Sequence, residues 1–362
     1  MVSMTSAESP TLRIRWTQPP LRDVASSIFN ALRAGKRLKA RHLRVHEGRI
    51  DLRGLPLPKP VPKGKLKLPS SESAPSFEFT IIRGRFEAAN VSLKRVDLSF
   101  SDLSHAVWKA CDFEDSLLCK AIVSQGFFRS CHFEDVVFDG ADLRDTLVGG
   151  CEGETITSFK RTSFRNADLR HTYYQYPVFE DCDFSHAKLD GVDFQGSRFT
   201  RCKFAGKMTR LWFRGLYTSP STSRGTKHRA RLRTTGIDPD SIWNPMADVD
   251  FSEAYLDDSM FVNQIDLSRC RFPDDGVHIV VKDREKVYSA VGKEIAESWS
   301  EPARSEALAL LERFANRKDQ VGQRMDVVNR KSHEQNPYLK PEQIKPWEHE
   351  FFDLLQRLAR IP

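Results

Sequence analysis

The densest group of side chains that could bind an anion is a basic cluster in the second half of the chain. Side chains of this kind hold phosphate oxygens in nucleic acids, and Trp212 and Trp243 on either side of the cluster could stack on bases. A run of charges that contacts only solvent is the alternative. The candidate residues for an anionic partner are Arg224, Lys227, His228, Arg229, Arg231 and Arg233.

Cysteine thiols recur at a regular spacing. Cys111, Cys131 and Cys151 are twenty residues apart, and so are Cys182 and Cys202. A column of thiols could bind a metal, but no histidine or carboxylate shares the spacing, and free cysteine commonly packs as a small apolar residue. The sequence also contains no phosphate-binding loop, nucleophile elbow, zinc-protease motif or dinucleotide turn. We therefore expect no metal, no cofactor and no enzymatic activity.

Large apolar residues form one stripe near the C-terminal end. Such a stripe either packs into the core of a helical domain or binds a partner or a second copy of the chain. The residues at helical spacing, which form a candidate partner or dimer interface, are Trp347, Phe351, Leu354, Leu355 and Leu358.

A five-residue period organises the region that must position these groups. Large apolar residues stand at every fifth position from Leu93 to Val148 and from Phe159 to Phe204, and a shorter run covers 251–272. A small or β-branched residue stands two positions before nearly every one of them. This period fits neither an α-helix nor a simple strand, and a short internal repeat is typical of a solenoid.

The count slips at two places. Val148 and Phe159 are eleven residues apart, which indicates one residue added near Gly153, and a second added residue lies between Phe261 and Leu267. We interpret both slips as bulges.

The units at 141–145, 167–171 and 192–196 resemble the A(D/N)LxX unit of the pentapeptide-repeat family, over roughly residues 86–206 and 249–274. The resemblance implies a right-handed, four-sided β-helix with one unit on each side of a twenty-residue coil. Phe179 should then stack between Phe159 and Phe199. The expected fold class is mainly β, a pentapeptide-repeat solenoid with a basic N-terminal helical arm and a C-terminal α-helical domain.

Charge is unevenly distributed along the chain. Residues 1–85 hold 17 Lys and Arg against 6 Asp and Glu, whereas residues 86–206 hold 14 against 19. The basic arm could lie on the acidic rod or bind an acidic partner. The expected divisions are a basic arm and Pro/Lys-rich linker at 1–76, the β-helix at 77–206, a basic loop insertion at 207–248, final repeats and a closing strand at 249–281, and the α-helical domain at 282–362.

Three functions fit these features. The first is a non-enzymatic scaffold, in which the rod presents surfaces to a protein partner. The second follows from the resemblance, because some pentapeptide-repeat proteins imitate duplex DNA and protect type II topoisomerases from inhibitors. The third is nucleic-acid binding through the basic arm and loop. No apolar run approaches the ~20 residues that span a bilayer, so we expect a cytoplasmic protein without a membrane segment.

Overall fold

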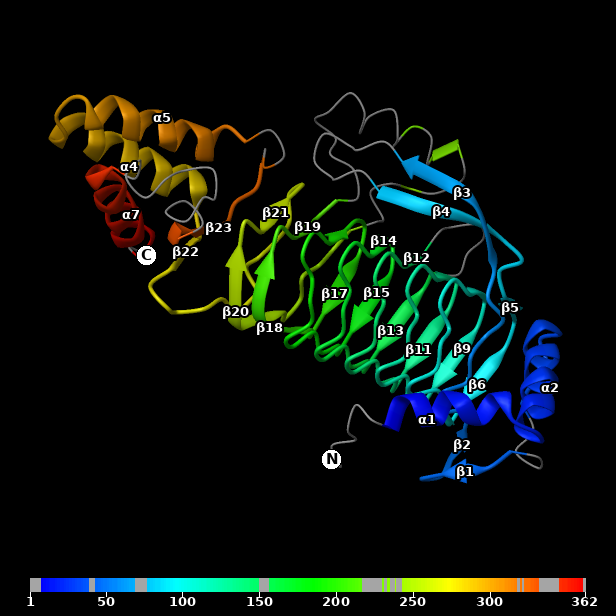
Figure 1. Ribbon diagram of the computed structural model, residues 1–362. Coiled ribbons are helices and arrows are strands. Elements are labelled where there is room, and N and C mark those ends of the chain that lie inside the picture. The colour runs from blue at the N-terminus through cyan, green and yellow to red at the C-terminus, as the bar shows by residue number, and fades with distance from the viewer. Residues whose placement is uncertain are drawn as a thin grey trace.

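Successive five-residue units wind into a stack of coils that forms a straight rod, with a helical cap at its N-terminal end and a helical domain at its C-terminal end (Figure 1). This computed structural model describes residues 8–38, 43–68, 77–149, 156–216, 230, 233–234, 238, 243–317, 320, 322–331 and 345–360. The rod confirms the expected mainly β solenoid.

Two parallel sheets run along the rod. In the first, the strand order is β21-β19-β16-β14-β12-β10-β8-β5, and in the second it is β17-β15-β13-β11-β9-β6. The eight-stranded sheet contains β5 (Glu87–Ala89), β8 (Val107–Lys109), β10 (Phe127–Arg129), β12 (Leu147–Gly149), β14 (Tyr173–Gln175), β16 (Asp193–Phe194), β19 (Trp212–Arg214) and β21 (Met260–Val262). The six-stranded sheet contains β6 (Ser92–Lys94), β9 (Asp112–Glu114), β11 (His132–Glu134), β13 (Ser158–Lys160), β15 (Val178–Glu180) and β17 (Arg198–Thr200).

The remaining two units of each coil pair in the same parallel sense. Single bridges such as Leu117 to Val137 and Ile122 to Asp142 form two further columns. Near the C-terminal end, β18 (Lys203–Thr209) pairs with β20 (Asp250–Asp257). Each coil therefore contacts its neighbours in four columns, one for each unit. The right-handed sense of the coil stays a prediction.

The corner between units has a left-handed backbone. At most of the described corners the residue two positions after the unit centre has a positive φ, as at Ala110 (49°), Gln125 (57°) and Arg201 (51°). The left-handed backbone conformation is disfavoured for any residue that carries a Cβ. It occurs here because each corner must turn the chain after only five residues.

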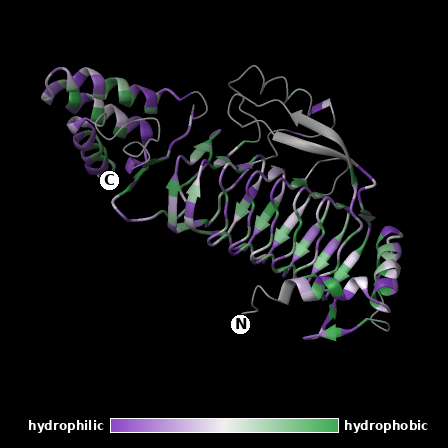
Figure 2. Cartoon of the chain, in the orientation of Figure 1, coloured by the Kyte–Doolittle hydropathy of each residue, from purple (hydrophilic) through white to green (hydrophobic). Residues whose placement is uncertain are grey.

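Large apolar unit centres fill the interior of the coils, and hydrophobic and hydrophilic residues alternate along each coil (Figure 2). Phe179 is fully buried, and its ring stacks on Phe159 at 4.9 Å and on Phe199 at 5.0 Å between centroids. Phe164, Phe184 and Phe204 form a second column of stacked rings. The stacking of residues one coil apart, as expected from the sequence, is confirmed.

The first slip in the count is larger than the sequence suggested. Phe133 pairs with Phe159, and Val148 with Tyr174, so Val148 and Phe159 lie on adjacent sides of one coil. Neighbouring centres are normally five residues apart, whereas these two are eleven apart, so six residues are added and the prediction of one is wrong. Gly153 itself lies outside the described residues. The second slip, after Phe261, remains a single residue, with left-handed Asn263 and Gln264 at the corner.

The expected loop insertion at 207–248 also has different bounds in the structure. β18 continues to Thr209, and β19 pairs with β16 and β21, so the chain stays in the coil as far as Leu216. The chain rejoins the coil at Trp243, which forms a bridge with Leu216. This excursion, the six added residues and the single added residue all follow a strand of the eight-stranded sheet. They therefore share one corner of the rod.

The basic arm lies on the first coil. Helix α1 (Glu8–Ile14) leads through the 3-10 turn η1 (Arg15–Thr17) into α2 (Leu21–Arg33), whose Phe29 packs edge-on against Phe86. β1 (Val45–His46) pairs with β2 (Arg49–Asp51), and β2 pairs with β7 (Val96–Asp97). Arg15 and Arg53 both bond Asp51, and Arg49 pairs with Asp115 on the rod.

The expected extended linker contains a hairpin. Leu55 and Leu57 are buried against the first coil, and β3 (Val61–Leu68) then pairs antiparallel with β4 (Phe77–Arg83). Figure 1 shows this hairpin standing away from the rod on the side of the eight-stranded sheet.

The described part of the C-terminal domain includes the three helices α4 (Arg284–Ser298), α5 (Ala303–Ala315) and α7 (Pro346–Ala359) and a two-stranded sheet. In this sheet β22 (His278–Val281) pairs antiparallel with β23 (Asp326–Asn329). Ile279 and Val281 pack with the helices in a second core. The strand expected to close the last coil therefore belongs to the C-terminal domain, because its partner strand comes from that domain.

Candidate binding cleft

Most of the predicted basic cluster lies outside the described residues. This applies to Arg224, Lys227, His228, Arg229 and Arg231. Arg233 is described and is exposed. Anion binding by the cluster therefore stays a prediction.

The C-terminal apolar stripe forms part of the core. Phe351 and Leu355 are fully buried and Leu354 is 5 % exposed, while Trp347 and Leu358 are half-buried against the same core. Helices α4 and α5 of the same chain cover this face of α7. The prediction of a partner or dimer interface is therefore wrong for the three buried residues, and core packing describes the stripe.

The described cysteines of the two columns pack inside the rod. Cys111, Cys131, Cys182 and Cys202 are all buried. Burial, together with the neighbouring thiol, raises the pKa of Cys131 and Cys182 far above the ordinary value, which keeps both as neutral thiols. No group of histidines, cysteines and carboxylates among the described residues could hold a metal ion.

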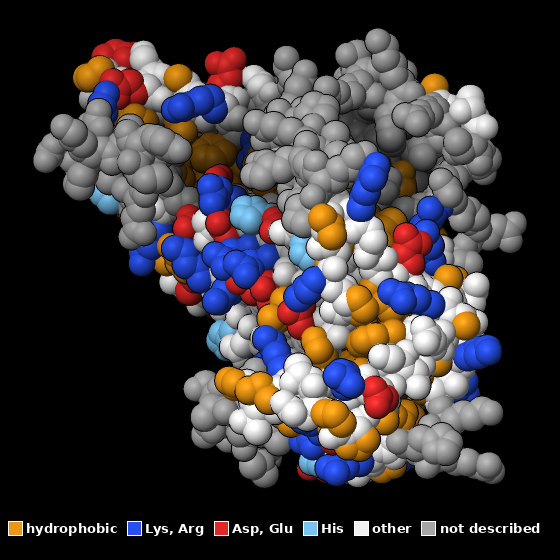
Figure 3. Space-filling model, turned by 45° about the vertical axis from the view of Figure 1, so that its right-hand side comes forward, with side chains coloured by type: hydrophobic (Ala, Val, Ile, Leu, Met, Phe, Trp, Pro, Cys, Tyr) orange, Lys and Arg blue, Asp and Glu red, His pale blue; other side chains and the backbone are white. Residues whose placement is uncertain are grey.

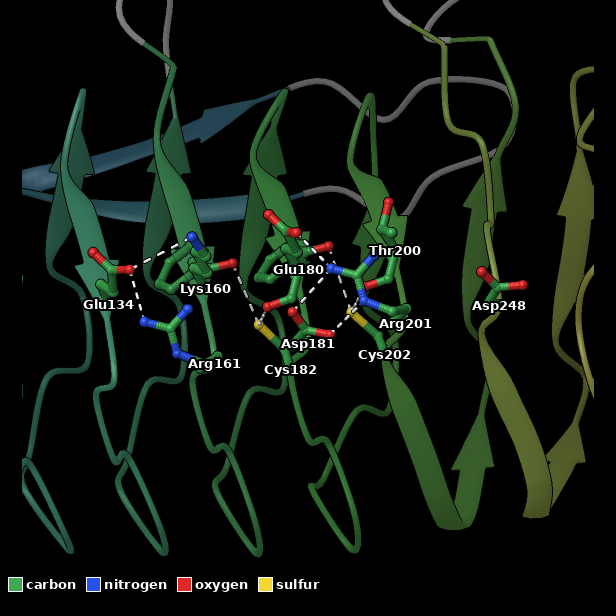
Figure 4. Close-up of polar contacts among 12 residues, drawn as sticks. Glu134, Lys160, Arg161, Glu180, Asp181, Cys182, Thr200, Arg201, Cys202 and Asp248 are labelled. Carbon is green, nitrogen blue, oxygen red and sulfur yellow. Dashed lines mark hydrogen bonds and ion pairs between the residues drawn. The ribbon is translucent and has the colours of Figure 1, made fainter.

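Ion pairs between coils neutralise the side of the rod that carries the six-stranded sheet. Arg161 bonds Glu134 of the preceding coil, and Arg201 bonds Glu180 and Asp181 in the same way (Figure 4). Arg161 also bonds Asp135. Basic and acidic side chains are intermingled over the rod in the view of Figure 3. Because these carboxylates have cationic neighbours, this surface lacks the dense uncompensated negative charge of a DNA backbone.

A cleft of about 1050 Å³ separates the last coil from the C-terminal domain. One wall is the last coil itself, from Gln264 to Asp274. The other wall is formed by β22, the turn before β23 and the end of α7. Leu267, Phe272 and Met325 belong to or pack against the hydrophobic core of the rod, so the cleft floor is the end of that core.

The C-terminal domain replaces the missing next coil on two sides of the rod. In earlier coils a unit centre such as Leu143 donates its backbone N–H to the next coil, at Asp168 O. At Leu256 the acceptor is instead Nε2 of His278, at 3.0 Å. The Nδ1 of His278 lies 2.8 Å from Asp275, so the ring can donate there and accept at Nε2.

The C-terminal domain also takes the place of the next strand at the edge of the eight-stranded sheet. The carbonyl oxygen of Phe261 accepts hydrogen bonds from Nε2 of Gln320 and of Gln323, at 3.0 and 2.9 Å. Asn329 donates to the carbonyl of Leu256. An open sheet edge invites pairing with other chains, and these side chains block it on two sides.

The third side of the last coil opens into the cleft. On this side Phe138, Phe184 and Phe251 each donate the backbone N–H to the following coil, at Ser163, Lys203 and Arg271. Phe272 is the last centre of the column, and its N–H has no hydrogen-bond acceptor among the described residues. The carbonyl of Cys270 likewise lacks a donor within the described part of the chain.

Three cations stand on the domain wall of the cleft, at Lys282, Arg324 and Arg360. All three are exposed, and none has an ion-pair partner among the residues that the structure describes. The opposite wall carries Asp266, which accepts the N–H of Ser268, and Asp274. The cleft thus combines an apolar floor, an open coil edge and a cationic wall.

Sequence reasoning did not predict this cleft. Its walls come from segments near 265, 280, 324 and 360, which have no common period. The end of the five-residue count at Phe272 marks the last coil, but the sequence does not show which of its four sides the helical domain leaves open.

A comparison with protein-family models matches residues 111–147 and 178–206 to pentapeptide repeats, in eight copies. Both segments lie in the stacked coils, which defines the class as a β-helical solenoid protein. The matched segments of this chain are pentapeptide repeats, as the resemblance of its units indicated.

Solved structures of pentapeptide-repeat proteins match at low identity. The plasmid-mediated fluoroquinolone resistance protein QnrB1 is 16 % identical, with 42 % of this chain and 90 % of that chain covered and a TM-score of 0.22. HetL of the cyanobacterium Nostoc sp. strain PCC 7120, involved in heterocyst differentiation regulation, is 16 % identical over 52 % and 81 %, with a TM-score of 0.25. Likenesses this weak carry no argument about function.

The search of curated proteins finds no match. Within the described part of the chain, none of the helices has the length and apolar character needed to cross a membrane.

Proposed function

We propose that this protein is a non-enzymatic scaffold that binds a protein partner in the cleft between its last coil and its C-terminal domain. The observation that carries the proposal is the contrast between the cleft and the rod. Ion pairs between coils neutralise the rod side that bears the six-stranded sheet. The cleft has an open edge and three cations for which the described residues supply no ion-pair partner.

The rigidity of the rod supports this role. Its coils are joined by parallel pairing along their whole length and by stacked rings such as Phe159, Phe179 and Phe199. A stack of this kind holds its two ends at a fixed separation. The partner site at one end then keeps a constant position relative to the basic N-terminal cap, in a cytoplasmic setting.

Affinity purification of the full chain from its native cells tests the proposal. The double variant Arg324→Glu/Arg360→Glu reverses two cations of the cleft wall, and Arg313→Glu reverses an exposed cation of α5 away from the cleft. We expect mass spectrometry to identify partners retained by the wild type and by Arg313→Glu but lost from the double variant. Identical partner lists for all three proteins would overturn the proposal.

A further inference from the structure

The open side of the last coil has the hydrogen-bonding groups of a strand that lacks its neighbour. In every preceding pair of coils one residue exchanges two bonds with the coil before it. Arg271, for example, donates its N–H to Val249 O and accepts from Phe251 N–H. Phe272 N–H and Cys270 O are the groups that the next such residue would bond, and both line the cleft.

The rest of the cleft fits an extended chain. A volume near 1050 Å³ is large enough for a peptide of several residues. The floor at Leu267 and Phe272 is where the apolar centres of a further coil would pack. Backbone bonds to a sheet edge supply affinity in this mode of recognition, and alternate side chains supply specificity.

The charges of the walls select the kind of peptide. Lys282, Arg324 and Arg360 all belong to the domain wall, while Asp266 and Asp274 belong to the coil wall. A strand bonded to the coil edge would therefore direct side chains on one of its sides toward three cations. Carboxylates form strong, charge-assisted hydrogen bonds with guanidinium and ammonium groups.

We propose that the cleft binds an extended, acidic segment of a partner protein, which adds to Phe272 and Cys270 as a further coil would. This inference rests on the proposed function and specifies the chemistry of the partner. One residue of the segment bonds both Phe272 N–H and Cys270 O, apolar residues beside it cover the end of the rod core, and acidic residues face the domain wall.

Fluorescence anisotropy with the full chain and three labelled peptides tests the backbone and charge requirements. The probes are an acidic peptide DVEVDVE, a basic peptide KVKVKVK and the acidic peptide with alternate backbone amides N-methylated. We expect the acidic peptide to bind at least about tenfold more tightly than either of the others, because the basic peptide repels the wall and N-methylation removes the donors to the coil edge. Equal binding by the basic or the N-methylated peptide would overturn the inference.

Variants locate the site. Arg324→Glu/Arg360→Glu should weaken binding of the acidic peptide at least about tenfold, while Arg313→Glu should leave it unchanged. Circular dichroism checks that each variant remains folded. Equal binding by the double variant would overturn the inference, and so would tighter, Arg324-dependent binding of a single-stranded oligothymidylate, since the occupant would then be a nucleic acid.

The two proposals fail in different ways. If the acidic peptide does not bind but the double variant still loses its partners in the purification, the scaffold function stands and the acidic-strand inference is overturned. If the partners are also unchanged, both are overturned.

Discussion

The carbonyl oxygen of Phe261 provides a direct test of how the C-terminal domain closes the rod. Two side-chain amides, from Gln320 and Gln323, donate to this single oxygen at 3.0 and 2.9 Å. Both side chains are buried, at 1 % and 5 % exposure. Either amide can satisfy the oxygen alone, so removal of one should leave a bonded carbonyl, whereas removal of both leaves a buried carbonyl without a donor.

The expected free energies follow from this redundancy. Each amide also donates a second hydrogen bond, from Gln320 to Asp326 and from Gln323 to Met325. Gln320→Met or Gln323→Met alone should therefore lower the free energy of unfolding by about 1–3 kcal/mol, the net contribution of two hydrogen bonds. The double variant adds the cost of an unpaired buried acceptor, about 1–3 kcal/mol. The loss in the free energy of unfolding of the double variant should therefore exceed the sum of the two single losses by at least about 1 kcal/mol. Methionine nearly preserves the side-chain volume, so little cavity cost is added.

Urea denaturation followed by circular dichroism measures the double-mutant cycle, and hydrogen exchange at β21 reports whether the loss lies at the rod end. Gln264→Met, at an exposed cleft residue, is the matched control and should change stability by less than about 0.5 kcal/mol. Additive costs of the two buried changes, or unchanged exchange at β21, would refute the account of the shared carbonyl.

Three other predictions concern the core, the cap and the rod surface. Phe179→Ala should cost about 3–5 kcal/mol in urea denaturation because the ring is fully buried between Phe159 and Phe199, and a loss below about 1 kcal/mol would contradict the stacked core. Burial acts to raise the pKa of Asp51, but Arg15 and Arg53 outweigh it and hold that pKa well below the ordinary value, so the stabilisation is present above about pH 4 and lost as the pH falls below it. Denaturation at pH 7 and pH 3 should show this loss reduced in Asp51→Asn, and an equal loss in both proteins would exclude the role of Asp51. Because rod carboxylates are paired, we expect neither inhibition nor inhibitor protection in a DNA gyrase supercoiling assay, and either effect would favour the DNA-mimic alternative.

The coils could be predicted from the sequence because their signal repeats. A large residue in a fixed phase, such as Phe133, Phe159 and Phe179, determines which side of the coil faces inward, and every coil gives the same information again. The five-residue count led to a wrong prediction for the slip after Val148. A gap of eleven residues fits either two units with one added residue or one unit with six added residues. Only the pairing of Phe133 with Phe159 decides between them.

The candidate site could not be predicted because it depends on contacts between distant segments. Phe351 and Leu355 show the same helical spacing whether they bind a partner or the helices α4 and α5. Likewise, nothing local to Leu256 indicates that the ring of His278 accepts its backbone N–H. Such assignments depend on tertiary packing, which a pattern of residue types does not record.

The shared corner after the eight-stranded sheet has a consequence for how this rod can change. The chain leaves the coil there by one residue, by six or by a long excursion. The parallel pairing resumes afterwards at Phe159 and Ala247, and the last coil pairs again at Arg271. At this corner the length of an insertion is therefore independent of the order of the stacked coils. The corner is a position at which evolution, or an engineer, can graft a recognition segment or a whole domain without redesigning the core.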